Sequence, residues 1–168
     1  KQRGSGAAVI QNSRAEMRPG YDDIIREIEA NGDPEAVAGM ARYGISPERN
    51  FGVCMPVLTA ISGRVGKDHA LAERLWSSGI RDAMIVAFMI DDPELVTEDQ
   101  MDRWVRDFRS WDICDGCCLH LFADAEPATR KAVEWTKSPS EFTKRAGYVM
   151  IAVIAVHDKK SGDGLFRS

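Results

Sequence analysis

The sequence has little of the material that membrane proteins and disulfide scaffolds require. Its longest uninterrupted apolar run, Ala146 to Val156, is eleven residues long, whereas a helix needs about 20 residues to cross a bilayer. No basic start leads into an apolar stretch with a small-residue cleavage site, so we expect no secretion. Only four residues are cysteine. These absences exclude a membrane protein and a secreted disulfide scaffold, and we expect a cytoplasmic location.

The sequence also lacks the common catalytic and cofactor-binding motifs. No glycine-rich phosphate loop, Ser-His-Asp arrangement or pair of metal-binding carboxylates on one helix is present. No two strand-like segments flank a hairpin signal. The composition is ordinary for one soluble globular domain: 44% of the 168 residues are hydrophobic and 29% are charged. The sequence therefore indicates a globular protein without a recognisable cofactor.

The charge is uneven along the chain. The net charge of −4, from 22 basic and 26 acidic residues, argues against a dedicated nucleic-acid-binding domain. Residues 1–96 carry 11 basic and 14 acidic groups, residues 97–125 carry 3 and 7, and residues 126–168 carry 8 and 5. A polyanion would therefore meet the C-terminal third of the chain.

Helix signals recur along the chain. Asp33-Pro34-Glu35 offers an N-cap, a proline at the first helical position and an acid in the first turn, and Asp92-Pro93-Glu94 repeats this trio. Thr97 with Gln100, and Ser138 with Glu141, resemble capping boxes. With the apolar spacing between these signals, we expect helices over residues 21–30, 34–43, 52–65, 68–78, 80–91, 97–109, 110–123, 127–137 and 140–158.

The order of these helices predicts the fold class. The links are short, so successive helices pair antiparallel, and pairs recur roughly every 30–45 residues. This favours an all-α superhelix of antiparallel helix pairs, a solenoid of the HEAT or armadillo type, over residues 21–168. A compact bundle is the alternative, because no clean consensus repeat is present. Residues 1–20 lack apolar periodicity and are expected to form a flexible N-terminal segment, while the continuous run Ala146–Val156 predicts a central buried helix.

One helix carries the most distinctive chemistry. Trp111 and Asp115 lie one turn apart and share a face, where an indole and a carboxylate together suit recognition of a cation. The alternative is that Trp111 fills the core and that Asp112 or Asp115 caps the helix start.

Three crowded cysteines lie on the same helix. Cys114, Cys117 and Cys118, with His120, invite a zinc interpretation, but zinc needs a second pair of ligands that the sequence does not supply. We therefore predict reduced, buried thiols and no bound metal.

Four basic residues flank the last helix. Lys159 and Lys160 follow it, where cations complement the helix dipole. Lys144 and Arg145 lie near its start, where the dipole gives them no role, so they are expected to reach toward solvent or a phosphate.

Several of these segments together resemble the AlkD-like DNA alkylation repair family. The resemblance covers about residues 35–166. It is carried by Gly52-Val53-x-x-Pro56, Asp68-His69-x-Leu71-Ala72-x-x-Leu75-Trp76-x-x-Gly79, Asp91-Asp92-Pro93, Met101-Asp102-x-Trp104-Val105-x-Asp107-Phe108-x-Ser110-Trp111-Asp112-x-Cys114-Asp115 and Lys144-Arg145-Ala146-Gly147.

The resemblance implies a HEAT-like-repeat DNA glycosylase that removes cationic N3- or N7-alkylated purines from double-stranded DNA. It assigns catalysis to Asp115 and Trp111 and a phosphate contact to Arg145, and it implies action without a base-flipping pocket. Lys144, Lys159 and Lys160 are the further DNA-binding candidates. No membrane and no obligate protein partner is implied.

Two features depart from the family. The family's chain usually continues through a further basic helix pair that supplies a second lesion-facing tryptophan, so we expect this chain to be a truncated form. The acidic balance is also unfavourable for a duplex-binding enzyme. The rival hypothesis is a non-catalytic helical-repeat module that binds DNA shape or a protein partner.

Overall fold

The computed structural model describes residues 18–46 and 48–157, and every regular element in these ranges is a helix. The expected boundaries agree with the observed ones to within three residues, which confirms the all-α class. None of the described helices combines the length and apolar character that a membrane crossing requires. In chain order the elements are α1 (Tyr21–Ala30), α2 (Pro34–Ala41), α3 (Met55–Val65), α4 (His69–Ser77), α5 (Arg81–Ile90), α6 (Glu98–Asp107), α7 (Trp111–His120), the 3₁₀ turn η1 (Phe122–Asp124), α8 (Ala128–Trp135) and α9 (Glu141–His157).

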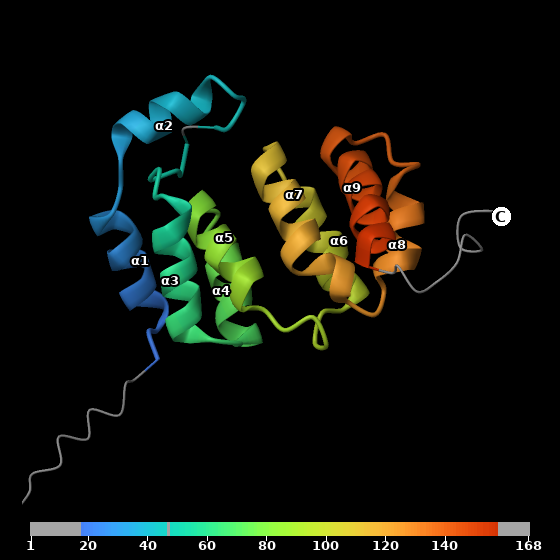
Figure 1. The fold of residues 1–168 in the computed structure, drawn as a ribbon, viewed down its shortest axis with the longest axis horizontal. Helices are drawn as coiled ribbons and strands as arrows, with labels where there is room; N and C mark the ends of the chain where they lie inside the picture. Colours follow the sequence, from blue (N-terminus) through green and yellow to red (C-terminus); the bar gives the residue numbers. More distant parts are fainter. Residues whose placement is uncertain (1–17, 47, 158–168) are drawn as a thin grey trace, which may run out of the picture.

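The helices stack in a row of antiparallel pairs (Figure 1). Helices α3, α5, α7 and α9 contact one another in that order, while α4 packs on α5 and α8 packs on α9. Because every second helix runs the same way, α3, α5, α7 and α9 all begin at one edge of the molecule, drawn at the top of Figure 1. We call this the leading edge and its opposite the trailing edge. Helices α1 and α9 lie at opposite ends of the row, as in a solenoid and unlike a bundle.

A run of aromatic rings joins the pairs inside the row. The indoles of Trp76 (α4) and Trp104 (α6) are stacked, with ring centroids 3.9 Å apart. Phe122 lies 6.2 Å from Trp104 and 5.9 Å from Trp135 of α8, measured between ring centroids. All four rings are buried, so offset and tilted aromatic contacts hold successive pairs together.

Local capping signals account for several helix starts. The Asp33 carboxylate accepts the backbone N–H groups of Glu35 and Ala36 and so caps α2 as expected. The Thr97 hydroxyl likewise accepts from the N–H of Gln100 at the start of α6.

Two of the expected start signals are wrong. Asp92-Pro93-Glu94 forms a turn, in which Asp92 accepts from the N–H of Glu94, and no helix follows until Glu98. The Ser138 hydroxyl accepts from the N–H of Ser140 instead of capping α9, which begins at Glu141. In both cases the side chain closes a local turn with a nearer N–H group.

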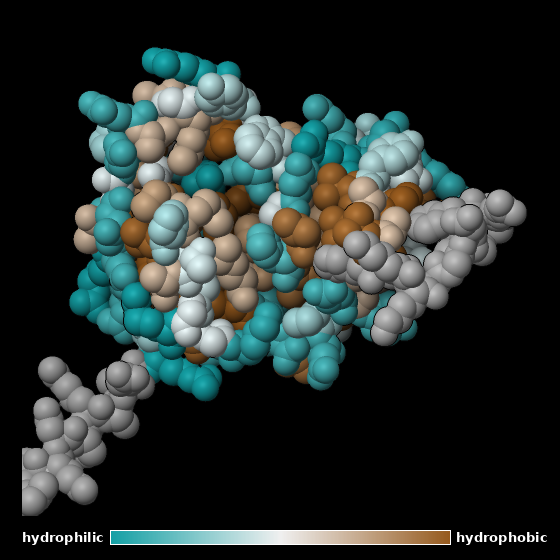
Figure 2. Space-filling view, viewed as in Figure 1, coloured by the Kyte–Doolittle hydropathy of each residue, from teal (hydrophilic) through white to brown (hydrophobic). Residues whose placement is uncertain are grey.

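The predicted central burial of Ala146–Val156 is also wrong. Ala146 and Met150 are fully buried, but Tyr148 is 60% and Val156 is 62% exposed. The cause is position, because α9 is the last of the described helices in the row and packs mainly on α8 and α7, with fewer contacts to α6 and η1. Figure 2 shows apolar surface over this helix and over the face of α3 and α5.

The ends of the chain fall outside the described residues. The expected flexible segment 1–20 is described only from Arg18 onward, and the helical domain expected over 21–168 is described to His157. The DNA-binding candidates Lys159 and Lys160 also lie outside the described residues.

Candidate functional site

Helix α7 separates its residues into two faces as the sequence predicts. Ile113, Cys114, Cys117 and Cys118 are buried, whereas Trp111 is 43% exposed and lies on the open face. The alternative of a core-filling tryptophan is therefore wrong. Helix spacing of four residues places Asp115 beside Trp111 on that open face.

The buried thiols fasten α7 to α9. The Sγ of Cys114 lies 3.6 Å from the carbonyl of Phe142, and that of Cys118 lies 3.8 Å from the carbonyl of Ala146. Burial raises the pKa of the Cys117 thiol well above its ordinary value, which keeps it protonated. Within residues 18–46 and 48–157 no group of three or more His, Cys, Asp and Glu residues is placed to hold a metal ion. The absence of bound metal stays a prediction.

The structure joins two predicted site residues in one ion pair. The Nε of Arg145 donates to Oδ1 of Asp115 at 2.7 Å, and its Nη2 donates to Oδ2 at 2.6 Å. The side chains are 44% and 33% exposed, so the pair stands at the surface. Hydrogen bonding to Asp115 raises the pKa of Arg145, against a smaller opposing effect of burial. The guanidinium of Arg145, which the resemblance assigns to a phosphate, therefore also holds the carboxylate of Asp115 in place.

Close helix packing sets the position of Arg145. Gly147, two residues after it, lies against the backbone of α8, so that a Cβ at this position would be 2.6 Å from the N of Thr136 and 2.8 Å from the O of Ala132. Only glycine allows this approach. On the other side of the pair, a Cβ at Gly116 would lie 2.7 Å from the ring of Phe88 in α5. Both partners thus come from helices held tightly by their neighbours.

The open face of α7 reaches toward α2. The Nε1 of Trp111 donates to the carbonyl oxygen of Tyr43 at 3.0 Å, and Tyr43 itself is 75% exposed. The loop after α2 therefore orients the indole while leaving much of it accessible to a ligand.

A buried charge network behind this face was not predicted from the sequence. Arg81 donates to Asp112 at 2.7 Å and to Asp82 at 3.2 Å. Asp82 is fully buried and also accepts the N–H groups of Phe51 and Val53 at 2.8 and 3.0 Å. The alternative role of Asp112 as a helix cap is wrong, because it binds Arg81 and the Ser110 hydroxyl. This network fixes the start of α7 against α5.

The sequence does hold a weak signal for such pairs. The contact Arg81–Asp112 spans 31 residues, Trp76–Asp107 also spans 31, and Asp115–Arg145 spans 30. These separations equal one helix pair, so polar residues one repeat apart are candidates for contact in a solenoid.

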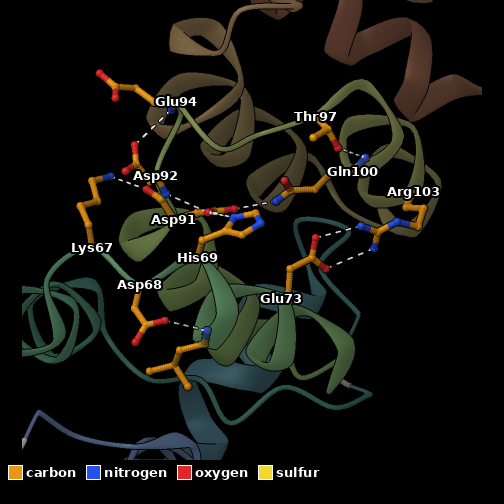
Figure 3. Close-up of polar contacts among 11 residues, drawn as sticks. Lys67, Asp68, His69, Glu73, Asp91, Asp92, Glu94, Thr97, Gln100 and Arg103 are labelled. Carbon is orange, nitrogen blue, oxygen red and sulfur yellow. Dashed lines mark hydrogen bonds and ion pairs between the residues drawn. The ribbon is translucent and has the colours of Figure 1, made fainter.

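A second polar cluster lies at the trailing edge and connects two loops (Figure 3). The fully buried carboxylate of Asp91 lies 2.7 Å from Nδ1 of His69 and accepts from Nε2 of Gln100 at 2.6 Å. Lys67 donates to the carbonyl oxygen of Asp91. Burial raises the pKa of Asp91, and the hydrogen bonds from His69 and Gln100 oppose the rise. The motifs Asp68-His69 and Asp91-Asp92-Pro93 therefore brace successive repeats, far from Trp111.

Of the remaining predicted residues, only Lys144 can be placed. It lies in the first turn of α9, is exposed, and has no ion pair with any other described residue. Its charge is therefore available to a ligand at the leading edge.

The comparisons with known proteins agree with this fold. The family model described as DNA alkylation repair enzyme matches residues 24–164. A solved structure from a family described as related to the HEAT-like repeat DNA glycosylases, with affinity for branched DNA structures, is similar at a TM-score of 0.74 and 25% identity, over 81% of this chain and 57% of that chain. No curated protein matches. The fold is thus a HEAT-like repeat, and the chain spans little more than half of that relative's length.

Proposed function

Because the chain belongs to the DNA alkylation repair enzyme family, we propose that it removes cationic N3- and N7-alkylated purines from double-stranded DNA. The reaction is hydrolysis of the N-glycosidic bond. The bond between C1′ and the purine breaks with its electron pair leaving on the base, which neutralises the alkylated ring. The oxygen of water then bonds to C1′ and loses a proton.

The observation that carries the proposal is the carboxylate of Asp115, one third exposed and held by Arg145 beside the exposed indole of Trp111. As the base departs, the deoxyribose gains positive charge. A fixed anion that needs no reorganisation stabilises such a charge best. The two hydrogen bonds from Arg145 hold Asp115 in place and use about two of its four acceptor positions, so about two remain for the sugar or the attacking water.

The other residues contribute binding and positioning. The indole of Trp111 offers a negative ring face to the cationic lesion or the developing sugar cation. Arg145 acts through Asp115 as a positioning residue. Lys144 is exposed at the same edge and contacts a phosphate. Lys159 and Lys160 complete the proposed set of backbone contacts.

A non-catalytic DNA-binding module is the second candidate. Two observations favour it: both oxygens of Asp115 are engaged by Arg145, and the similar solved structure is described by affinity for branched DNA. On this alternative the Asp115–Arg145 pair only stabilises the contact between α7 and α9, and the chain binds DNA without releasing a base.

The two candidates differ in one experiment. Release of N7-methylguanine from methylated duplex DNA is measured under single-turnover conditions for the unmodified chain, Asp115→Asn and Asp99→Asn. Asp99 is exposed in the first turn of α6, at the trailing edge, and serves as the matched control. We expect Asp115→Asn to lose about 3–4 kcal/mol of transition-state stabilisation, a fall of about 10²–10³-fold, with duplex affinity retained. Equal release by the two variants would remove Asp115 from the mechanism.

A further inference from the structure

A cavity of about 330 Å³ opens at the leading edge, between the α4–α5 pair and the α6–α7 pair. The loop after α2 closes one side, and the turn between α6 and α7 closes another. Ser110, the N-cap of α7, and Ile113 of α7 line it, and these two residues flank Trp111 in the sequence. The volume falls in the range of small-ligand sites and is large for a lone phosphate ion.

The inner wall of the cavity is apolar and rigid. Ile45, Trp76, Met84 and Ile113 line it, and each is at least nine-tenths buried. Trp76 is fixed twice, since its Nε1 donates to Asp107 at 2.9 Å and its ring stacks on Trp104. A flat apolar group could pack here without displacing a side chain.

Cations surround the same cavity. The side chain of Arg49 has no hydrogen-bonded or ionic partner among the described residues, and the side chain of Arg109 donates only to the backbone carbonyls of Arg106 and Phe108. Arg81 also lines the cavity but is neutralised by its aspartate partners. Of the two acids in the lining, Asp107 is engaged by Trp76, and Glu48 is exposed. The guanidinium of Arg49 and the Nε and Nη2 donors of Arg109 can thus engage phosphate oxygens.

We propose that this cavity binds one unpaired nucleotide of a DNA strand. The base packs against the apolar wall, and the phosphates on either side of it contact Arg49 and Arg109. Both halves of the lining are needed for this ligand, because a phosphate alone would leave the apolar wall unused and a neutral apolar ligand would leave both arginines unused. The choice of DNA as the source of the nucleotide rests on the proposed function.

The test compares two probes that differ by one nucleotide. One is a duplex with a single unpaired 2-aminopurine, and the other is the same duplex fully paired. We expect the chain to bind the duplex with the unpaired nucleotide about tenfold or more tightly than the paired duplex, because one base gains a contact with the apolar wall. Binding should also change the fluorescence of the 2-aminopurine. A single-stranded 2-aminopurine trinucleotide with phosphates at both ends reports on the cavity without a duplex.

Matched variants separate the parts of the proposal. Ser77→Phe places a ring at the cavity, and Ala70→Phe places the same ring on an exposed position of the same helix at the trailing edge. Only Ser77→Phe should abolish the preference for the unpaired nucleotide. Arg49→Gln should weaken binding of the trinucleotide at least about fivefold, whereas Arg130→Gln, a charge loss in α8, should not.

Two results would overturn the proposal: a preference that survives Ser77→Phe, or equal effects of Arg49→Gln and Arg130→Gln. Release of methylated purines without any preference for the unpaired nucleotide would contradict nucleotide binding in the cavity, but it would not contradict the proposed function. The reverse result, preference without release, would support the cavity and contradict the proposed excision.

Discussion

Replacing Gly147 by alanine tests how the candidate site is held together. The added Cβ would lie 2.6 Å from the N of Thr136, 2.8 Å from the O of Ala132 and 2.9 Å from the carbonyl C of Trp135. All three atoms are backbone atoms of the α8 segment, so no side chain can rotate away and the two helices must separate. Overpacking of this kind costs about 1–3 kcal/mol, and we expect the upper end because three contacts are violated together.

Gly63 provides the matched control. It lies in α3, is exposed, and a Cβ there would meet nothing within 4 Å. Gly63→Ala should therefore stabilise the chain by about 0.5–1 kcal/mol through helix propensity. Urea unfolding followed by circular dichroism gives both free energies of unfolding. The reasoning is refuted if Gly147→Ala is as stable as the unmodified chain, or if both substitutions shift stability in the same direction.

Three further expectations follow from charges and thiols. Burial tends to raise the pKa of Glu73, but the hydrogen bond and the charge of Arg103 outweigh burial and lower the pKa. The ionised Glu73 should therefore stabilise the folded chain above about pH 4.5, and this stabilisation should vanish as the pH falls further. Urea unfolding midpoints across pH 2.5–7 should differ between the unmodified chain and Glu73→Gln at the higher pH values and converge at the lower ones. In thiol titration with a disulfide reagent, the exposed Cys54 should react at once and the three buried cysteines of α7 only on unfolding; fast reaction of more than one thiol would contradict their burial. Asp82→Ala should cost about 2–5 kcal/mol, since it leaves the backbone N–H groups of Phe51 and Val53 without an acceptor and removes one of the two carboxylates that bind Arg81; a thermal midpoint within a degree of the unmodified chain would exclude that role.

The helices were predictable because their signals are local. The Asp33 and Thr97 caps act within three residues, and apolar periodicity shows which face of each helix is buried. The pairing of Trp111 with Asp115 on one face of α7 follows from the same rule. Periodicity cannot tell where a helix lies in a row, so the apolar run from Ala146 onward predicts a central helix although α9 is the last of the described helices.

Contacts between repeats were not predictable from local signals. His69 meets Asp91 across 22 residues and Arg81 meets Asp112 across 31, and both contacts exist only once the pairs are stacked. The ion pair of Asp115 with Arg145 belongs to this class. The sequence indicates its two residues only separately, since their contact depends on how closely α9 approaches α7.

The central claim is that this chain cleaves the bond to a cationic purine instead of only binding DNA. The most direct measurement is the rate of N7-methylguanine release from duplex DNA at saturating protein, compared with spontaneous depurination of the same DNA in the same buffer. The account predicts release well above the spontaneous rate, reduced by Asp115→Asn about 10²–10³-fold toward that background. Release at the spontaneous rate by a chain that demonstrably binds the duplex would contradict it.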